Sequence, residues 1–161
     1  MNKPDFFNAM SLLSASVNII TTDGPAGKGG ITASAVCAVT DTPPTILVCI
    51  NKRSSIHNKI IQNKQVCINI LSAGQEDIAR VFAGQSDISH DERFIQSLWL
   101  VGSNGVPLLQ EATVNLQGEV SYQQDSGSHT VFFIALSAGS CKDTPSSLTY
   151  CYRQFHSLGH C

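Results

Sequence analysis

The chain has 161 residues, and we expect one domain with its core over about residues 6–156 and a tail over 157–161. Hydrophobic residues make up 42% of the chain and charged residues 14%, an apolar share that predicts a buried interface between two copies. The formal net charge of −2 gives no basic excess for a nucleic-acid or anionic-membrane partner, and no apolar run reaches the ~18 residues that span a bilayer.

The N-terminal segment MNKPDFF lacks an apolar signal core, which predicts a cytoplasmic protein. Asp5 is expected to cap a first helix that packs over the end of a barrel through a stripe formed by Phe6, Met10 and Leu13. A strand over 17–22 and a Gly-rich turn over 23–30 follow. The turn is not a phosphate-binding P-loop, because neither a Gly-Lys-Ser/Thr sequence nor a helix follows it.

The stretch 29–58 predicts a strand, a Pro-Pro connection, a second strand and a helix start. The first strand, over 31–40, carries small side chains that would let a flat ligand lie against it and reach its backbone groups. The second, over 45–51, is nearly all apolar and is expected to be buried on both faces. Ser54 and Ser55 then open a helix beside basic residues, which suits a phosphate. Close packing against a sheet or subunit would explain the small residues equally, and an ordinary helix cap would explain the serines.

The remaining elements are read from apolar spacing and turn residues. A helix over 54–62 and a buried strand over 66–71 precede a second helix, which Ser72 and Gln75 open as a capping box and Gly84 ends. Further strands are expected over 97–102, 113–123, 129–138 and 148–155, with a turn over 124–127. In the strand over 113–123, strict alternation predicts Val114, Leu116, Val120 and Tyr122 inward and Asn115, Gln117, Glu119 and Ser121 outward.

These elements predict a mainly β domain of about seven or eight strands, mostly antiparallel, with two or three short helices. Strands and helices do not alternate regularly, so a barrel is favoured over a doubly wound parallel sheet.

Six cysteines are present. Cys37, Cys49 and Cys67 lie in predicted apolar strands, where free thiols pack as small hydrophobic groups. The others show no CxxC or CxxH spacing, so neither a zinc site nor disulfides are expected. The ending Gly159-His160-Cys161 could bind a metal adventitiously, but a frayed terminus is the simpler interpretation.

One resemblance covers about residues 6–156. Its landmarks are TASAVCAVTDTPPTILVCIN continued by RSSIHN, then Phe82-Ala83-Gly84, Glu92-Arg93-Phe94, Gly127-Ser128-His129 and the segment 150–156. In this order they resemble the short-chain flavin reductases that serve two-component monooxygenases, with the reductase components of 4-hydroxyphenylacetate 3-monooxygenases as the nearest group. The resemblance implies a flavin-binding split β-barrel, antiparallel and Greek-key-like, that forms a homodimer.

The implied activity is NAD(P)H-dependent reduction of FAD or FMN, with the free reduced flavin supplied to a separate aromatic-hydroxylating monooxygenase. Hydride would pass directly between the cofactors, so no catalytic acid or base is expected. Two alternatives share the barrel: a non-catalytic flavin-binding electron carrier and a relative of pyridoxamine-phosphate oxidase. The sequence does not distinguish FAD from FMN, and no arginine pair offers a site for the 2′-phosphate of NADPH.

The resemblance also implies site residues. Ten would bind the flavin: Thr32, Ala33 and Ser34 at the ring, Asn51, Lys52, Ser54 and Ser55 at the ribityl chain and phosphate, Phe82 and Ala83 at the adenosine or dimethylbenzene side, and Arg93 as a cation. Arg93 could instead be a solvated charge. Phe82 and Gly84 could equally be a core residue and a helix end.

Four residues would contact the nicotinamide nucleotide: His129, Tyr150, Arg153 and Phe155. Such families commonly have Gly-Asp-His where this chain has Gly-Ser-His, and tend to be more basic at Tyr152 and Gln154. Without the resemblance, His129 is a half-exposed residue at a strand end and the aromatic residues close the barrel.

Overall fold

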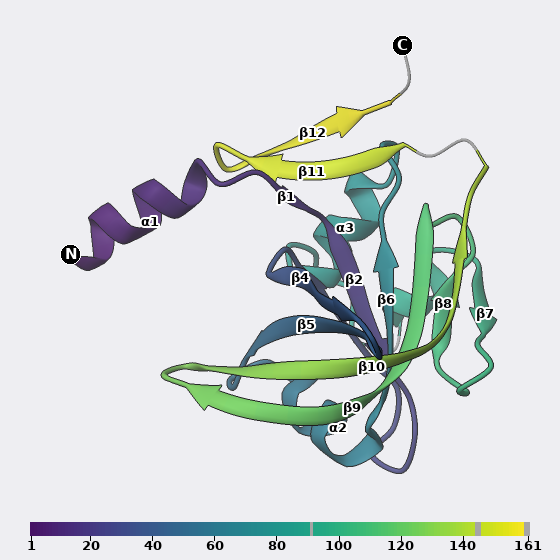
Figure 1. Ribbon diagram of the computed structural model, residues 1–161. Coiled ribbons are helices and arrows are strands. Elements are labelled where there is room, and N and C mark those ends of the chain that lie inside the picture. Colours follow the sequence, from purple (N-terminus) through teal and green to yellow (C-terminus); the bar gives the residue numbers. More distant parts are fainter. Residues whose placement is uncertain (91, 144–145, 160–161) are drawn as a thin grey trace.

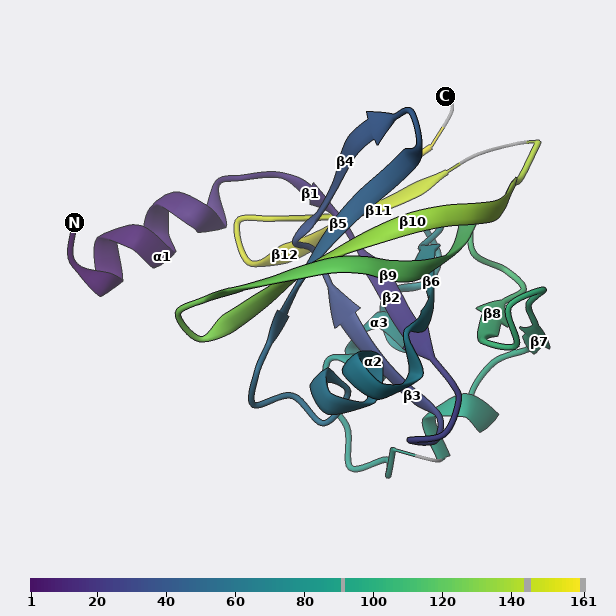
Figure 2. The same ribbon diagram turned by 60° about the horizontal axis from the view of Figure 1, so that its bottom comes forward.

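The structure is a computed structural model, and it describes residues 1–90, 92–143 and 146–159. Its centre is a seven-stranded antiparallel sheet in the order β3-β2-β6-β9-β10-β5-β4, which curls strongly (Figures 1 and 2). The strands are β2 (Asn18–Thr22), β3 (Gly29–Ala33), β4 (Val36–Asp41), β5 (Pro44–Asn51), β6 (Gln65–Ile70), β9 (Val114–Ser126) and β10 (His129–Cys141). The mainly β, antiparallel fold expected from the sequence is confirmed.

The two edge strands of this sheet, β3 and β4, are neighbours in sequence. The expected single strand over 31–40 is therefore wrong: it breaks at Ser34 and Ala35, where the chain leaves its pairing with β2 and begins to pair with β5. The Cys49 N–H donates to the Ala35 carbonyl, and the Asn18 side-chain amide donates to the Ala33 carbonyl. This two-residue link joins the opposite edges of the sheet, as a split barrel requires.

Two smaller sheets complete the β structure. One contains β1 (Ala15–Ser16), β11 (Ser147–Cys151) and β12 (Gln154–Leu158), and the other pairs β7 (Trp99–Val101) with β8 (Pro107–Leu109). The strand expected over 148–155 is thus a hairpin in a separate sheet. It turns at Tyr152 and Arg153, whose φ angles of 53° and 60° lie in the left-handed region.

The first helix, α1 (Lys3–Ser11), projects from the rest of the chain (Figure 1). Its cap is Asn2, whose Oδ1 accepts from the Asp5 N–H, so the expectation that Asp5 is the cap is wrong. No residue of α1 is buried, and Phe6, Met10 and Leu13 do not pack over a barrel end within this chain.

Two short helices lie against the central sheet. The helix α2 (His57–Asn63) begins later than expected, because the Ser54 hydroxyl donates to the Asn51 carbonyl in a turn that precedes it. The helix α3 (Glu76–Phe82) forms only half of the expected capping box. Gln75 Oε1 accepts from the Ser72 N–H, but the N-cap is Gln75 and no side chain of the described residues caps the helix, so Ser72 as the cap is wrong. Gly84, with φ of 74°, ends α3 as predicted. Its N–H donates to the Val81 carbonyl, and the Gln85 N–H donates to the Arg80 carbonyl.

The core has two parts on opposite faces of β2. Ile20 joins the cluster enclosed by the curled sheet and α2, whereas Val17 and Ile19 join a cluster between the sheet and α3. In β5, only the face of Ile46, Val48 and Ile50 is fully buried; Leu47 and Cys49 are half-buried, so burial on both faces is not complete.

The alternation in β9 placed several side chains on the wrong side. Asn115 and Gln117, expected outward, are buried, because the segment 102–113 covers that face of the sheet. The Asn115 amide donates to Asn69 Oδ1 and to the Leu109 carbonyl, and Gln117 Oε1 accepts from Ser103 Oγ. Tyr122, expected inward, is 58% exposed, and β9 continues to Ser126, so the turn falls at Gly127 and Ser128.

The cysteines are mostly as expected. Cys67 is buried, which raises the pKa of its thiol to about 12, and burial also raises the pKa of Cys49. Cys37 is exposed on the edge strand β4, contrary to the expectation that it packs inside. The five cysteines in the described residues are free, and Cys161 with His160 lies outside those residues.

Candidate functional site

A cavity of about 140 Å³ collects predicted residues from three parts of the chain. We call it the ring cavity. Its lining includes three predicted flavin residues and two predicted nicotinamide residues: Thr32, Ser34, Ala83, Tyr150 and Phe155, with Val17 and Gln85 beside them. These residues come from the end of β3, the end of α3 and the β11–β12 hairpin. The structure therefore joins segments that are far apart in sequence, since 49 residues separate Ser34 from Ala83 and 67 separate Ala83 from Tyr150.

Local contacts fix the walls of the ring cavity. The Thr32 hydroxyl donates to the Ala79 carbonyl of α3 at 2.7 Å, which ties β3 to that helix. The rings of Tyr150 and Phe155 meet edge to face with centroids 5.1 Å apart, and the Arg80 guanidinium lies 4.8 Å from the Phe155 centroid. The cavity has small side chains on one side and aromatic rings on the other, which suits a flat conjugated ligand.

A second, larger hollow of about 410 Å³ adjoins the ring cavity, because Ser34 and Tyr150 line both. It also contains Arg153 and residues of α1, among them Phe7 and Met10. Arg153 Nη2 donates to Asn8 Oδ1 at 2.9 Å, so the guanidinium is held beside α1.

His129 lies elsewhere. It opens β10 directly opposite Asn51 at the end of β5, and its Nδ1 is 2.9 Å from Ser128 Oγ. The neighbouring Lys52 N–H donates to the Ser128 carbonyl. His129 therefore stands with two predicted ribityl and phosphate residues, Asn51 and Lys52, and not in the hollows lined by the other three predicted nicotinamide residues.

A chain of polar contacts supports this second group. Lys52 Nζ lies 2.9 Å from Asp125 Oδ2, and the Thr130 hydroxyl donates to Asp125 Oδ1 at 2.7 Å. Both contacts lower the pKa of Asp125, that of Lys52 most. Because the Thr130 hydroxyl donates to Asp125, its oxygen accepts from His57 Nε2 at 2.8 Å. No sequence pattern predicted this network, which joins Lys52 before α2, His57 in α2, Asp125 in β9 and Thr130 in β10.

The two serines have different surroundings. The Ser54 hydroxyl is bound to the Asn51 carbonyl at 2.8 Å, and the Asn51 side chain accepts from the Arg53 N–H. Ser55 instead lines a small cavity of about 50 Å³ with Lys28, Gly29, Gly30, Ile56, Lys59 and His90. Neither lysine nor His90 was predicted as a site residue. The one available signal was spacing, since Lys59 follows Ser55 by four residues, one helical turn.

Arg93 is only 9% exposed, so its interpretation as a solvated charge is wrong. A Cβ added to Gly84 would lie 3.9 Å from Arg93 Nη2, which places the guanidinium at the end of α3, next to Ala83. Its Nε is buried and finds no hydrogen-bond partner among the described residues. A buried guanidinium with an unmatched donor is suited to an anion.

Two predicted flavin residues do not reach the ring cavity with their side chains. Phe82 is 1% exposed and packs against Phe94 and Trp99 with centroids 5.2 Å and 5.4 Å away, which makes it a core residue, as its alternative interpretation held. Ala33 packs against the other core cluster, on the opposite face of β3 from Thr32.

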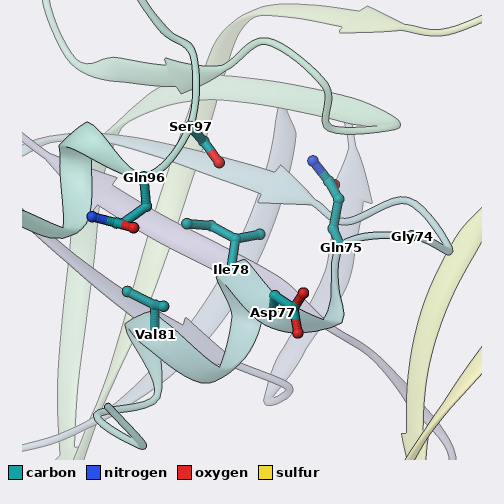
Figure 3. Close-up of a pocket in the computed structure, with 7 residues that line it drawn as sticks. All are labelled: Gly74, Gln75, Asp77, Ile78, Val81, Gln96 and Ser97. Carbon is teal, nitrogen blue, oxygen red and sulfur yellow. The ribbon is translucent and has the colours of Figure 1, made fainter. Parts of the chain in front are cut away.

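A further cavity of about 250 Å³ lies on the outer side of α3 (Figure 3). Ile78 and Val81 project toward it from the helix, and Gln96 and Ser97 border it from the facing loop (Figure 3). None of the predicted flavin or nicotinamide residues lines it, and Gln75 at its edge already accepts the Ser72 N–H. It is therefore not a candidate for the flavin site.

Two kinds of feature are absent from the described residues. No helix there is long and apolar enough to cross a membrane. No cluster of three or more His, Cys, Asp and Glu side chains in residues 1–90, 92–143 and 146–159 could hold a metal ion.

Known proteins are similar to this chain over almost its whole length. FMN reductase (NADH) RutF from Escherichia coli K12 is 44% identical over 158 residues, 98% of this chain and 95% of RutF. A structure from Haemophilus somnus 129PT, described as a flavin reductase, is 35% identical with a TM-score of 0.93 over 98% of this chain and 100% of that chain.

A third similarity concerns the fold alone. BorF, the flavin reductase component of a bacterial two-component tryptophan halogenase, is 23% identical with a TM-score of 0.91, over 99% of this chain and 100% of BorF. The model of the flavin reductase like domain matches residues 10–159, almost the whole chain. The chain belongs to the flavin reductase family that this domain defines.

Proposed function

We propose that this protein is an NADH-dependent flavin reductase that supplies reduced flavin to a separate oxygenase. The observation that carries the proposal is the ring cavity, where Thr32, Ser34 and Ala83 face Tyr150 and Phe155. The similarity to RutF, named as an NADH-dependent FMN reductase, supports NADH and FMN as the cofactor pair. BorF serves a two-component tryptophan halogenase, which supports a separate flavin-using component as the recipient.

The residues present suit a flavin and its reductant. A bound flavin accepts hydride from the nicotinamide, so the protein needs only to hold two flat rings against each other. The Thr32 hydroxyl is already bound to Ala79, so β3 presents small side chains and backbone groups to a ring. The Tyr150–Phe155 pair supplies aromatic surface to the same cavity, and the adjoining hollow with Arg153 offers room for a second nucleotide.

A single domain that consumes NADH fits the cytoplasm, where we propose that the enzyme works. We retain Asn51, Lys52, Ser54 and Ser55 as the proposed ribityl and phosphate contacts, with Ser55 and Arg93 best placed for the phosphate. Ser54 acts by holding the turn that presents Ser55, because its own hydroxyl is bound to Asn51.

The activity is tested by following NADH absorbance with and without added FMN or FAD. We expect oxidation that requires added flavin and is fastest with FMN. A carrier would bind flavin without oxidising NADH. A relative of pyridoxamine-phosphate oxidase would oxidise pyridoxamine phosphate with oxygen and leave NADH untouched. Either result would contradict the proposal.

Arg93→Ala should weaken flavin binding about tenfold or more, because a hydrogen bond to a charged group contributes ~1.5–3 kcal/mol. The measurement is quenching of flavin fluorescence on titration with protein. Arg93→Lys should restore part of the affinity, since the charge remains and the fork of donors is lost. Lys142→Ala, which removes a surface cation paired with Glu111, is the control. A correctly folded Arg93→Ala variant with unchanged affinity would exclude Arg93 from the site.

His129→Ala should raise the KM for NADH with little change in flavin affinity, if His129 contacts the nicotinamide nucleotide. Hydride transfer needs the two rings to be stacked and takes no proton from His129. The variant should therefore lose binding that the ground state and the transition state share, which raises KM and leaves kcat unchanged. Stopped-flow reduction of bound flavin over a range of NADH concentrations measures both. Loss of flavin affinity alone would instead make His129 a flavin-binding residue, together with its partner Asn51 at the end of β5.

We propose a homodimer held in part by α1. Phe6, Met10 and Leu13 are 49%, 46% and 65% exposed, an apolar surface that a second copy would cover. Sedimentation at micromolar concentration should give about twice the 17.2 kDa of one chain. Met10→Glu should shift the equilibrium toward monomer, and Asp5→Asn, an exposed position on the same helix, should not. A wild-type protein that sediments as a monomer would refute this assembly.

A further inference from the structure

One lining residue of the ring cavity differs in chemistry from the others. Of the seven described residues that line the cavity, Gln85 alone has a side-chain nitrogen. The other side-chain polar groups of the lining are hydroxyls, and that of Thr32 is already bound to the Ala79 carbonyl. Gln85 is not among the residues that the sequence marked for flavin or nicotinamide, and its amide is a donor that those residues do not supply.

The end of α3 places Gln85 beside Arg80, five residues earlier in the chain. The Gln85 N–H donates to the Arg80 carbonyl at 3.0 Å, and the Gly84 N–H donates to the Val81 carbonyl at 3.2 Å. These two bonds form a Schellman motif, in which a hydrophobic contact often joins the residues at the two positions that Arg80 and Gln85 occupy. Here a polar contact takes that place, because Arg80 Nη1 donates to Gln85 Oε1 at 3.1 Å.

This contact fixes which way the Gln85 amide faces. A guanidinium has donors and no acceptor, so the amide oxygen of Gln85 must face Arg80. The N–H groups of Nε2 remain, and they have no partner within residues 1–90, 92–143 and 146–159. Because Gln85 lines the ring cavity, these N–H groups are available to a ligand there.

Glu76 and Phe155 hold the Arg80 guanidinium in turn. Arg80 Nε and Nη2 donate to Glu76 Oε1 at 2.9 Å and 2.6 Å, and the guanidinium lies 4.8 Å from the Phe155 ring centroid. Arg80 thus contacts two lining residues, Gln85 after α3 and Phe155 in β12. Because Glu76 balances the charge of Arg80, the pair presents a neutral amide donor to the cavity, which favours an uncharged acceptor.

A carbonyl oxygen is an uncharged acceptor that both ligands of a flavin reductase carry. The pyrimidine ring of a flavin has carbonyl groups, and nicotinamide has a carboxamide. Each carbonyl projects from the edge of a flat ring, in the plane where an N–H group can meet it. A hydrogen bond in that plane fixes the rotation of the ring and leaves its faces free for the stacking that hydride transfer needs.

We propose that Gln85 is a specificity-determining residue that donates an amide N–H to a carbonyl of the ring bound in the ring cavity, and that Arg80 is the positioning residue that orients this amide. The inference rests on the proposed function, because it takes the ring cavity as the place where flavin and nicotinamide meet. The carbonyl belongs either to the flavin or to the nicotinamide, and the experiment separates these two sources.

The sharpest variant is Gln85→Glu, which keeps an acceptor for Arg80 and removes both N–H donors. Because a carboxylate also repels a carbonyl oxygen, the Kd of FMN or the KM for NADH should rise about tenfold or more. Gln85→Ala, which removes the donors without adding a charge, should raise the same constant about three- to tenfold. Gln110→Glu, which adds the same charge at an exposed position outside the cavity lining, is the control.

Two measurements on the Gln85 variants identify the source of the carbonyl. Quenching of flavin fluorescence gives the Kd of FMN, and the NADH assay at saturating FMN gives KM and kcat. A rise in the Kd of FMN assigns the carbonyl to the flavin. A rise in the KM for NADH, with the Kd of FMN and kcat unchanged, assigns it to the nicotinamide carboxamide.

Arg80→Lys tests the positioning role. Lysine keeps a cation beside Glu76 and Phe155 but lacks the planar fork that bonds Glu76 and Gln85 together. Arg80→Lys should raise the same constant as Gln85→Ala does, by about threefold. In a Gln85→Ala background it should add little, because Arg80 then has no amide to hold. An equal factor in both backgrounds would show a merely structural role and overturn the positioning role.

An unchanged Kd and KM in both Gln85 variants would overturn the inference, and so would an equal rise in Gln110→Glu. The wild-type protein tests the proposed function separately. If it fails to oxidise NADH but binds FMN in a Gln85-dependent way, the proposed function fails and the role of Gln85 stands. If it oxidises NADH and Gln85→Glu keeps the wild-type constants, the role of Gln85 fails alone.

Discussion

The fold depends on one link, the two residues Ser34 and Ala35 that carry the chain from one edge of the curled sheet to the other. The bond from the Cys49 N–H to the Ala35 carbonyl and the bond from the Asn18 side-chain amide to the Ala33 carbonyl hold the two sides of this link. Ser34 and Ala35 are both exposed, so the closure of the sheet rests on these contacts and not on packing of their side chains. Ser34 also lines the ring cavity with Thr32, so the link that closes the sheet contributes to the wall of the candidate ligand site.

The termination of α3 is the second element of this arrangement. Gly84 adopts a left-handed conformation that ends the helix beside the ring cavity, so Ala83 reaches the rim while Phe82 stays in the core. The Thr32–Ala79 hydrogen bond fixes the helix on β3 from the other side. Arg93 Nη2 lies near the same glycine, so a buried cation stands at the end of this helix. The end of α3 therefore positions both Ala83 and that cation.

Sequence patterns predicted a feature well where neighbouring residues determine it. They failed where burial depends on a segment that is distant in the sequence. The glycine that ends α3 acts within one helical turn, so it was predictable. The inward and outward faces of β9 were not, because Asn115 and Gln117 are buried by the segment 102–113, whose position depends on Asn69 and Thr21 far away in sequence. The ring-cavity residues came from the family resemblance. Lys28, Lys59 and His90 come from three separate segments and form a cluster only in the folded chain.

The electrostatics of the cations argue for where an anionic cofactor binds. Lys52 already has Asp125 as a partner at 2.9 Å, and Arg153 is held by Asn8, so both have part of their binding capacity satisfied. Arg93 is buried with an unmatched Nε, and leaving a buried charge unpaired is costly. Lys28 and Lys59 share a cavity, where their mutual repulsion opposes the packing of α2 on β3. An anion beside Arg93 would offset the cost of its unpaired charge, and an anion beside Lys28 and Lys59 would offset their mutual repulsion. An anion beside Lys52 would instead have to compete with a carboxylate.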